Sequence, residues 1–141
     1  MIDKPTKKEL GKKGRRSGKN FELEVRHHLE EEGWFVTKFS NIIKDNKMIH
    51  APHKFIPFRG VIPGQGFPDF ICWRKVAEPL SDYSNGVKFY YEIIGVESKK
   101  NKYLSPEEKI MVDLLLKMGV FSFIRVYYKK KRGELEYYVF G

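Results

Sequence analysis

Three acidic residues have the types and positions needed to bind a cation together, and a lysine is expected beside them. Asp69 opens the predicted strand DFICWRK, and Glu97 lies near the end of the next predicted strand, VKFYYEIIGVES, two residues before Lys99. Residues i and i+2 of a strand point to the same face, so Glu97 and Lys99 stand side by side. If the two strands pair as a hairpin, the start of one lies beside the end of the other. Asp69 and Glu97 are therefore expected to meet.

Glu22 is the third acid of this set. It follows Phe21 in a predicted helix, where one residue turns the side-chain direction by about 100°, so Glu22 lies beside the apolar stripe. Carboxylates gathered at a sheet edge repel one another, and Mg²⁺ is the hard cation that ordinarily joins such oxygen ligands. A site of this kind polarises a phosphodiester, and the Lys99 ammonium beside it offsets the charge that grows on phosphorus. The pattern predicts a Mg²⁺ site for phosphodiester hydrolysis.

The same residues also fit a plainer interpretation. The chain has 27 Lys and Arg and 18 Asp and Glu among 141 residues, so an Asp followed by Glu-x-Lys arises easily by chance. Glu97 and Lys99 would then form a surface ion pair worth at most about 1 kcal/mol. The context favours the metal site, because Asp69 begins one apolar strand, Glu97 and Lys99 end the next, and a well-capped helix follows.

The composition indicates a single folded domain with a polyanionic partner. An apolar content of 41% and an aromatic content of 15% argue against disorder. The net charge of +9 favours nucleic acid, because each Lys or Arg that meets a phosphate releases a condensed counterion. With no long apolar run and no basic amphipathic helix, membrane association is not expected. The single Cys72 is expected to be a small buried residue of a reducing, cytoplasmic protein.

Basic residues are concentrated at the N-terminus and directly after the candidate site. Residues 1–19 carry eight Lys or Arg against Asp3 and Glu9 and have no apolar period, which indicates a flexible basic arm. A solvated tail that only aids solubility fits this composition equally well. The candidate nucleic-acid contacts are Lys13, Arg15, Arg16, Lys19, Lys100 and Lys102. Lysines at a phosphate-cutting centre would position the backbone without reading the sequence, although a solvated loop is the alternative for the last two.

The elements that must position the acids follow from periodicity and from capping signals. Ser17 or Asn20 is the predicted cap of a first helix, whose core stripe recurs every four residues and which ends at Gly33. A second helix is predicted after residue 105, with the buried stripe Ile110, Leu114 and Met118 flanked by Met111 and Leu115. Its start is marked by a Ser cap, a Pro at the first helical position and a Glu that closes a capping box.

The remaining segments are predicted to be strands or the connections between them. WFVTKFS is the first predicted strand, and the Pro- and Gly-rich segment 40–67 is irregular with room for a short strand. The strands around Asp69 and Glu97 are connected by EPLSDYSNG, in which Asn85-Gly86 is the predicted turn. Two strands joined by KKKRG end the chain. The predicted fold is α/β, a mixed central sheet flanked by helices in the order αβββαβ.

Taken together, the segments FPDFICW, GVESKK and YLSPEEK, preceded by SGKNFELEVRHHLEEEGWFV, resemble the PD-(D/E)XK nuclease superfamily. They are most similar to archaeal Holliday junction resolvases and to virus-type replication-repair nuclease domains. The resemblance implies a restriction-endonuclease-like core over residues 20–141, with residues 1–19 as the arm. It also implies a homodimer that cuts branched DNA such as a four-way junction, with Mg²⁺ as cofactor and Mn²⁺ as a substitute.

The resemblance also assigns roles to single residues. Glu22, Asp69 and Glu97 would bind the metal together with the main-chain carbonyl of Ser98, and Lys99 would be the catalytic lysine. The chain departs from the resolvase pattern in having Leu23 after the helix glutamate and in its larger segment 40–66. Two other functions stay open: a non-catalytic nucleic-acid-binding module with the same fold, and a nuclease that acts on RNA or on linear ends.

Overall fold

The computed structural model describes residues 4–62, 64–81, 84–131 and 133–141. Its elements are α1 (Lys7–Glu31), β1 (Phe35–Lys38), β2 (Asn41–Lys44), β3 (Lys47–His50), β4 (Lys54–Ile56), β5 (Gly60–Ile62), β6 (Phe70–Ser81), β7 (Ser84–Ser98), α2 (Pro106–Lys117), β8 (Phe123–Lys131) and β9 (Glu134–Phe140). Neither described helix has the length and apolar content needed to cross a membrane.

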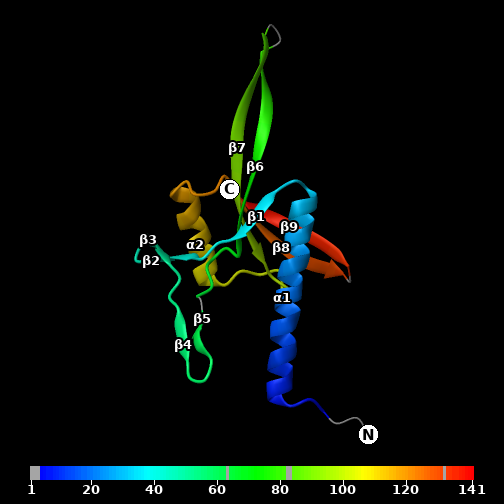
Figure 1. Cartoon of the computed structure of the whole chain (residues 1–141), viewed down its shortest axis with the longest axis vertical. Helices are drawn as coiled ribbons and strands as arrows, with labels where there is room; N and C mark the ends of the chain where they lie inside the picture. Colours follow the sequence, from blue (N-terminus) through cyan, green and yellow to red (C-terminus); the bar gives the residue numbers. More distant parts are fainter. Residues whose placement is uncertain (1–3, 63, 82–83, 132) are drawn as a thin grey trace.

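A mixed five-stranded sheet with the order β1-β6-β7-β8-β9 forms the centre of the molecule (Figure 1). β7 and β8 run parallel, with α2 as the crossover between them, and the other neighbouring strands of this sheet run antiparallel. Two small hairpins, β2–β3 and β4–β5, are separate from this sheet. The predicted α/β class and the mixed central sheet with flanking helices are confirmed.

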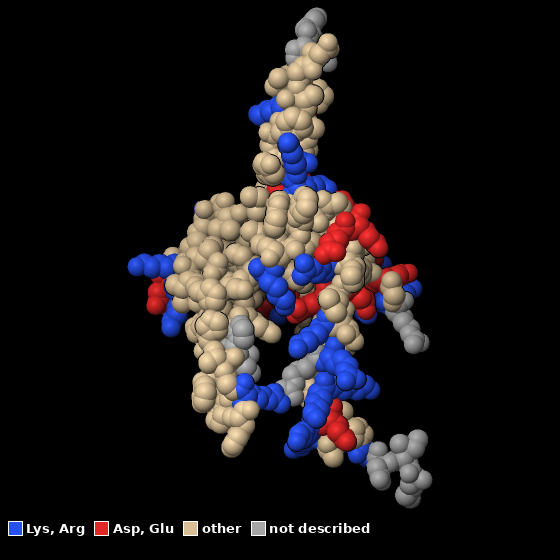
Figure 2. Space-filling model, viewed as in Figure 1, with Lys and Arg blue, Asp and Glu red and all other residues tan. Residues whose placement is uncertain are grey.

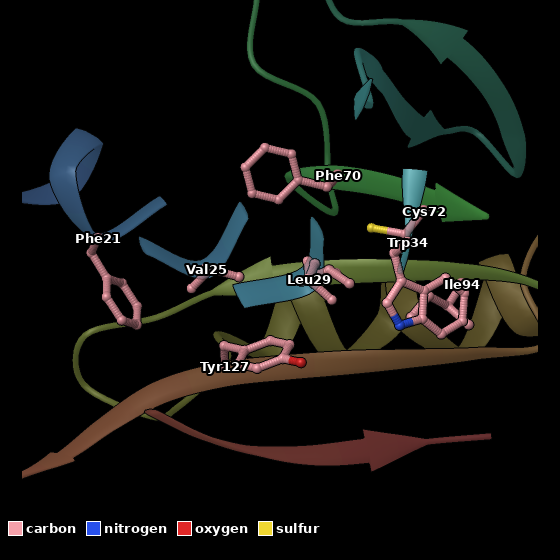
Figure 3. Close-up of a cluster of buried hydrophobic side chains, with 9 residues drawn as sticks. Phe21, Val25, Leu29, Trp34, Phe70, Cys72, Ile94 and Tyr127 are labelled. Carbon is pink, nitrogen blue, oxygen red and sulfur yellow. The ribbon is translucent and has the colours of Figure 1, made fainter. Parts of the chain in front are cut away.

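The two helices cover opposite faces of the sheet. Phe70 and Cys72 of β6 point toward α1 and pack with Val25 and Leu29, as Figure 3 shows. Ile71, between them in the strand, packs instead with the cluster that contains the buried α2 side chains. This alternation is the period of two that a strand covered on both faces must show. Cys72 is fully buried, which confirms its predicted place in the core, and burial raises the pKa of its thiol to about 12.

Helix α1 begins at Lys7, not at Ser17 or Asn20, so the prediction of a flexible arm up to residue 19 is wrong for residues 7–19. Thr6 and Glu9 form a capping box at its start: the N–H of Thr6 donates to Oε2 of Glu9 at 2.7 Å, and the N–H of Glu9 donates to Oγ1 of Thr6 at 3.2 Å. The lysines and arginines that follow are good helix formers. This part of the helix has no apolar period because it extends beyond the sheet and has no core to face (Figure 1). The predicted end of the helix at Gly33, with φ of 93°, is confirmed.

The hairpin of β6 and β7 is longer than predicted. The pairing continues past Ala77↔Phe89 to Ser81↔Ser84, so Asn85 and Gly86 lie in β7 and the Asn85-Gly86 turn prediction is wrong. Residues 82 and 83, which connect the two strands, lie outside the described residues. Cross-strand pairs that contain aromatic and β-branched residues stabilise the two strands, and the hairpin extends away from the rest of the sheet (Figure 1).

The segment 40–67 and α2 also differ from the sequence-based prediction. Where an irregular segment was expected, two hairpins form, and Asp45 and Asn46 make the first turn with positive φ angles of 51° and 59°. In α2 the fully buried side chains are Val112 and Leu115. The prediction is confirmed for Leu115 and for Met111, which packs against the same core, but it is wrong for Ile110 and Met118, which are 60% and 42% exposed, and it missed Val112. Both faces of this helix carry apolar residues, so the periodicity alone did not distinguish them.

Candidate active site at the start of β6 and the end of β7

Asp69 and Glu97 are brought together by the antiparallel pairing of β6 and β7. Phe70 pairs with Val96, which places the residue before β6 next to Glu97. The main-chain N–H of Asp69 donates to Oε2 of Glu97 at 3.0 Å. In return, the N–H and the hydroxyl of Ser98 donate to Oδ2 of Asp69, at 2.9 Å and 2.6 Å. The two acids are therefore fixed by bonds in both directions, as the hairpin interpretation of the sequence requires.

Close backbone packing fixes the approach to Asp69. The N–H of Phe39 donates to the carbonyl of Asp69 at 3.0 Å. A Cβ at Gly66 would lie 2.1 Å from the main-chain oxygen of Phe39, and one at Gly95 would lie 2.8 Å from Pro68. A side chain at Gly66 would collide with the main chain of Phe39 and Asn41, and one at Gly95 would push the segment before β6 away from β7, so glycine is required at both positions.

Burial raises the pKa of both acids, most strongly that of Glu97. Glu97 is 5% exposed, and burial raises its pKa to about 9, with the negative charge of Asp69 adding to the effect and Lys99 opposing it. Burial also raises the pKa of Asp69, against the lowering effect of the bonds from Ser98. Two adjoining buried carboxyl groups of this kind are stabilised either by a proton or by a bound cation.

Lys99 is held between Glu97 and Glu108. Its Nζ lies 2.7 Å from Oε2 of Glu108 and 3.5 Å from Oε1 of Glu97. Burial alone would lower the pKa of Lys99, but the bond to Glu108 and the two glutamate charges outweigh it, so the pKa is raised. Glu108 also closes the capping box of α2 by accepting from the N–H of Ser105 at 3.2 Å. Sequence reasoning identified Glu108 only as a cap and missed its contact with Lys99.

Glu22 lies on the α1 side of Asp69, and its charge raises the pKa of Asp69. Its Oε2, however, accepts from Nζ of Lys38 at 3.0 Å. Lys38, at the end of β1, was also missed, since nothing in the sequence marks it apart from the other exposed lysines. Among the residues that the structure describes, no three His, Cys, Asp or Glu side chains gather closely enough to hold a metal ion. The structure thus joins Asp69, Glu97 and Lys99, while Glu22 pairs with a lysine nearby.

The donor set at this edge suits a hard divalent cation in its chemistry. Asp69 and Glu97 offer carboxylate oxygens, the ligands that Mg²⁺ prefers, at a partly buried position. Burial is the main cause of the raised pKa of both acids, with the charges of neighbouring acids adding to it, and a bound cation would favour the ionised carboxylates against both effects. Ser98 contributes its N–H and hydroxyl to Asp69, so it positions this carboxylate irrespective of any role for its carbonyl.

The predicted nucleic-acid contacts fall into two groups. Lys13, Arg16 and Lys19 line a cleft beside α1, and Figure 2 shows the Lys and Arg side chains gathered over this helix. The backbone of Arg15 lies in α1, and its side chain is outside the described part of the chain. Near the site, Nζ of Lys100 bonds to Oγ of Ser17, which joins the loop after β7 to α1, and Lys102 lies 5.0 Å above the ring of Tyr128.

No protein-family model, curated protein or solved structure matches this chain.

Proposed function

We propose that the chain is a Mg²⁺-dependent DNA endonuclease of the PD-(D/E)XK type that acts on branched DNA such as a four-way junction. The observation that carries the proposal is the convergence of Asp69, Glu97 and Lys99 at one edge of the sheet, beside the N-terminus of α2. The order helix, three strands of one sheet, helix, strand supports a restriction-endonuclease-like core for this site.

In this proposal Asp69 and Glu97 would hold the cation, with Glu22 and the carbonyl of Ser98 as further ligands. When bound, Mg²⁺ supplies Lewis-acid polarisation of the phosphodiester and makes a coordinated water more acidic. Glu97 must lose its proton to act as a ligand, so cation binding and proton release are coupled. Ser98 keeps the Asp69 carboxylate in one orientation.

Lys99 is the proposed catalytic cation. Its ammonium would face the reacting phosphate and offset the negative charge that develops there. Glu108 is a positioning residue, because its 2.7 Å contact holds the ammonium next to Glu97. Hydrolysis would leave a 5′-phosphate and a 3′-hydroxyl, as the family resemblance implies. Two symmetric cuts across a junction need two sites, and we propose a homodimer for this reason, testable by measuring the mass in solution.

A cleavage assay tests the proposal. Four-way junction, linear duplex and single-stranded DNA, with RNA of the same sequence, are incubated with Mg²⁺ or with chelator. We expect Mg²⁺-dependent cleavage, preferentially of the junction, and a loss of about 10²- to 10³-fold in Lys99→Ala, the usual cost of removing one charge-stabilising group. Lys117→Ala, an exposed lysine at the far end of α2, is the matched control. Equal cleavage by wild type and Lys99→Ala would refute the assignment.

A non-catalytic nucleic-acid-binding module is the second candidate. The observation that favours it is that Glu22 pairs with Lys38 instead of joining Asp69 and Glu97. Thermal unfolding with and without Mg²⁺ separates the two functions. The nuclease should be stabilised by Mg²⁺, and Asp69→Asn should abolish this effect, whereas a binding module should show salt-dependent DNA binding and no Mg²⁺ effect on unfolding.

A further inference from the structure

A basic cleft lies between the N-terminal half of α1 and the β4–β5 hairpin. It has a volume of about 820 Å³ and is lined by Lys12, Lys13, Arg16 and Lys19 of α1 and by Arg59 from the turn of the hairpin. In Figures 1 and 2 the two segments extend from the same side of the molecule with a hollow between them. None of the ion pairs among the described residues uses any of these five cations, so their charge is available to an anionic partner.

The spacing of these cations fits a nucleic-acid strand. From Lys12 to Lys19 the helix rises by about 10 Å, at about 1.5 Å per residue. Each strand of duplex DNA carries one phosphate for about every 3.4 Å of the duplex axis, and neighbouring phosphates lie farther apart than this along the strand itself, so this length of helix reaches about two to three of them. A second, smaller pocket shares Lys19 and Leu23 with the cleft and includes Glu22 and Phe70. The cleft therefore leads along α1 toward the start of β6, where Asp69 lies.

The hairpin that forms the other wall carries an exposed aromatic residue at its tip. Phe58 is fully exposed, at 107%, and has a φ of 69°, a left-handed conformation that a bulky residue rarely adopts. It directly precedes Arg59, which faces the cleft. Proteins that bind unpaired nucleic acid combine a basic groove along the backbone with aromatic side chains on which bases stack. The cleft and Phe58 together have both parts.

We infer that the cleft holds the backbone of one nucleic-acid strand and that Phe58 stacks on an exposed base next to it, at a branch point or in a single strand. This inference rests on the proposed function for its nucleic-acid substrate, and it adds the part of the molecule that selects a branch point over regular duplex. In a regular duplex every base is already stacked, so Phe58 could contact a base there only at an unstacking cost of about a few kcal/mol, a cost that is absent where stacking is already interrupted. An acidic protein would also complement the charge of the cleft, but it has no base to stack on the aromatic side chain.

Binding measured without cleavage tests the inference. Fluorescence anisotropy of labelled four-way junction, single strand and linear duplex is recorded in chelator, for wild type and for Phe58→Ala and Arg16→Gln/Arg59→Gln. We expect Phe58→Ala to weaken binding to junction and single strand about tenfold, as for the loss of one stacked base, and to leave linear duplex binding unchanged. The double variant should reduce the slope of log K against log salt by about 0.7 for each lost contact to a single strand.

Two variants on the β6–β7 hairpin are the controls. Phe89→Ala removes a side chain that is also exposed, at 56%, and Lys88→Gln removes a cation from the same strand. The inference is overturned if Phe58→Ala binds like wild type, if Phe89→Ala shows the same loss, or if Phe58→Ala weakens duplex and junction equally. If the wild type cleaves DNA and the cleft variants bind it normally, only this inference is refuted. If binding depends on the cleft but the wild type does not cleave, only the proposed nuclease function is refuted.

Discussion

Replacing Glu97 by glutamine tests the electrostatics of the site. The pKa of Glu97 is raised from 4.5 to about 9 in the folded protein, chiefly by burial and then by Asp69. Between these two values the folded state holds a proton that the unfolded state has lost, so the contribution of Glu97 to stability falls as pH rises. The slope is about 1.4 kcal/mol per pH unit, and the loss is complete above the folded pKa.

At pH 7 this cost amounts to about 3 kcal/mol, since pH 7 lies about 2.5 units above the unperturbed pKa. Glu97→Gln removes the titration but keeps an oxygen that can accept from the N–H of Asp69. In the presence of chelator, Glu97→Gln should therefore be more stable than wild type at pH 7 by up to about 3 kcal/mol, and the difference should grow toward pH 9. Addition of Mg²⁺ should stabilise wild type and not the variant.

Urea unfolding at several pH values between 5 and 9 measures the effect. Glu107→Gln, at an exposed position of α2, is the control and should follow the wild-type pH profile. If Glu97→Gln has the same pH dependence as wild type, or is less stable than wild type at pH 8 in chelator, the argument that burial keeps Glu97 protonated is wrong.

Three further substitutions test single contacts. Ser98→Ala removes the 2.6 Å hydroxyl bond to Asp69 and should cost about 1.5–3 kcal/mol in urea unfolding at neutral pH, as for a bond to a charged acceptor; an unchanged midpoint would contradict this. Thr6→Ala removes the cap of α1 and should cost about 1 kcal/mol, with hydrogen exchange accelerated in the first turns of the helix and unchanged in α2. Gly66→Ala should prevent folding or lower the midpoint of thermal unfolding sharply, because its Cβ would collide with main-chain atoms. Gly14→Ala has open space around it and should instead stabilise the protein by about 0.5–1 kcal/mol. Similar effects of the two substitutions would refute this reasoning.

The pairing of Asp69 with Glu97 was predictable because it depends on local information. Two apolar strands in sequence form a hairpin, and the pairing of antiparallel strands then places the start of one beside the end of the other. The α2 cap at Ser105 was readable for a similar reason, since capping depends on residues within one turn. The turn between β6 and β7 was not, because the cross-strand pairs of the longer hairpin outweigh a favourable Asn-Gly sequence.

By itself the sequence determined the α/β class, the central strands, the capped second helix, the buried cysteine and the meeting of the two acids. Only the tertiary structure decided which charges neutralise each other, because Lys38 of β1 reaches Glu22 of α1, and Lys99 after β7 reaches Glu108 of α2. It also decided that the basic residues of α1 face the turn of a hairpin containing Arg59. Such contacts depend on how elements pack, and periodicity and capping carry no information about that packing.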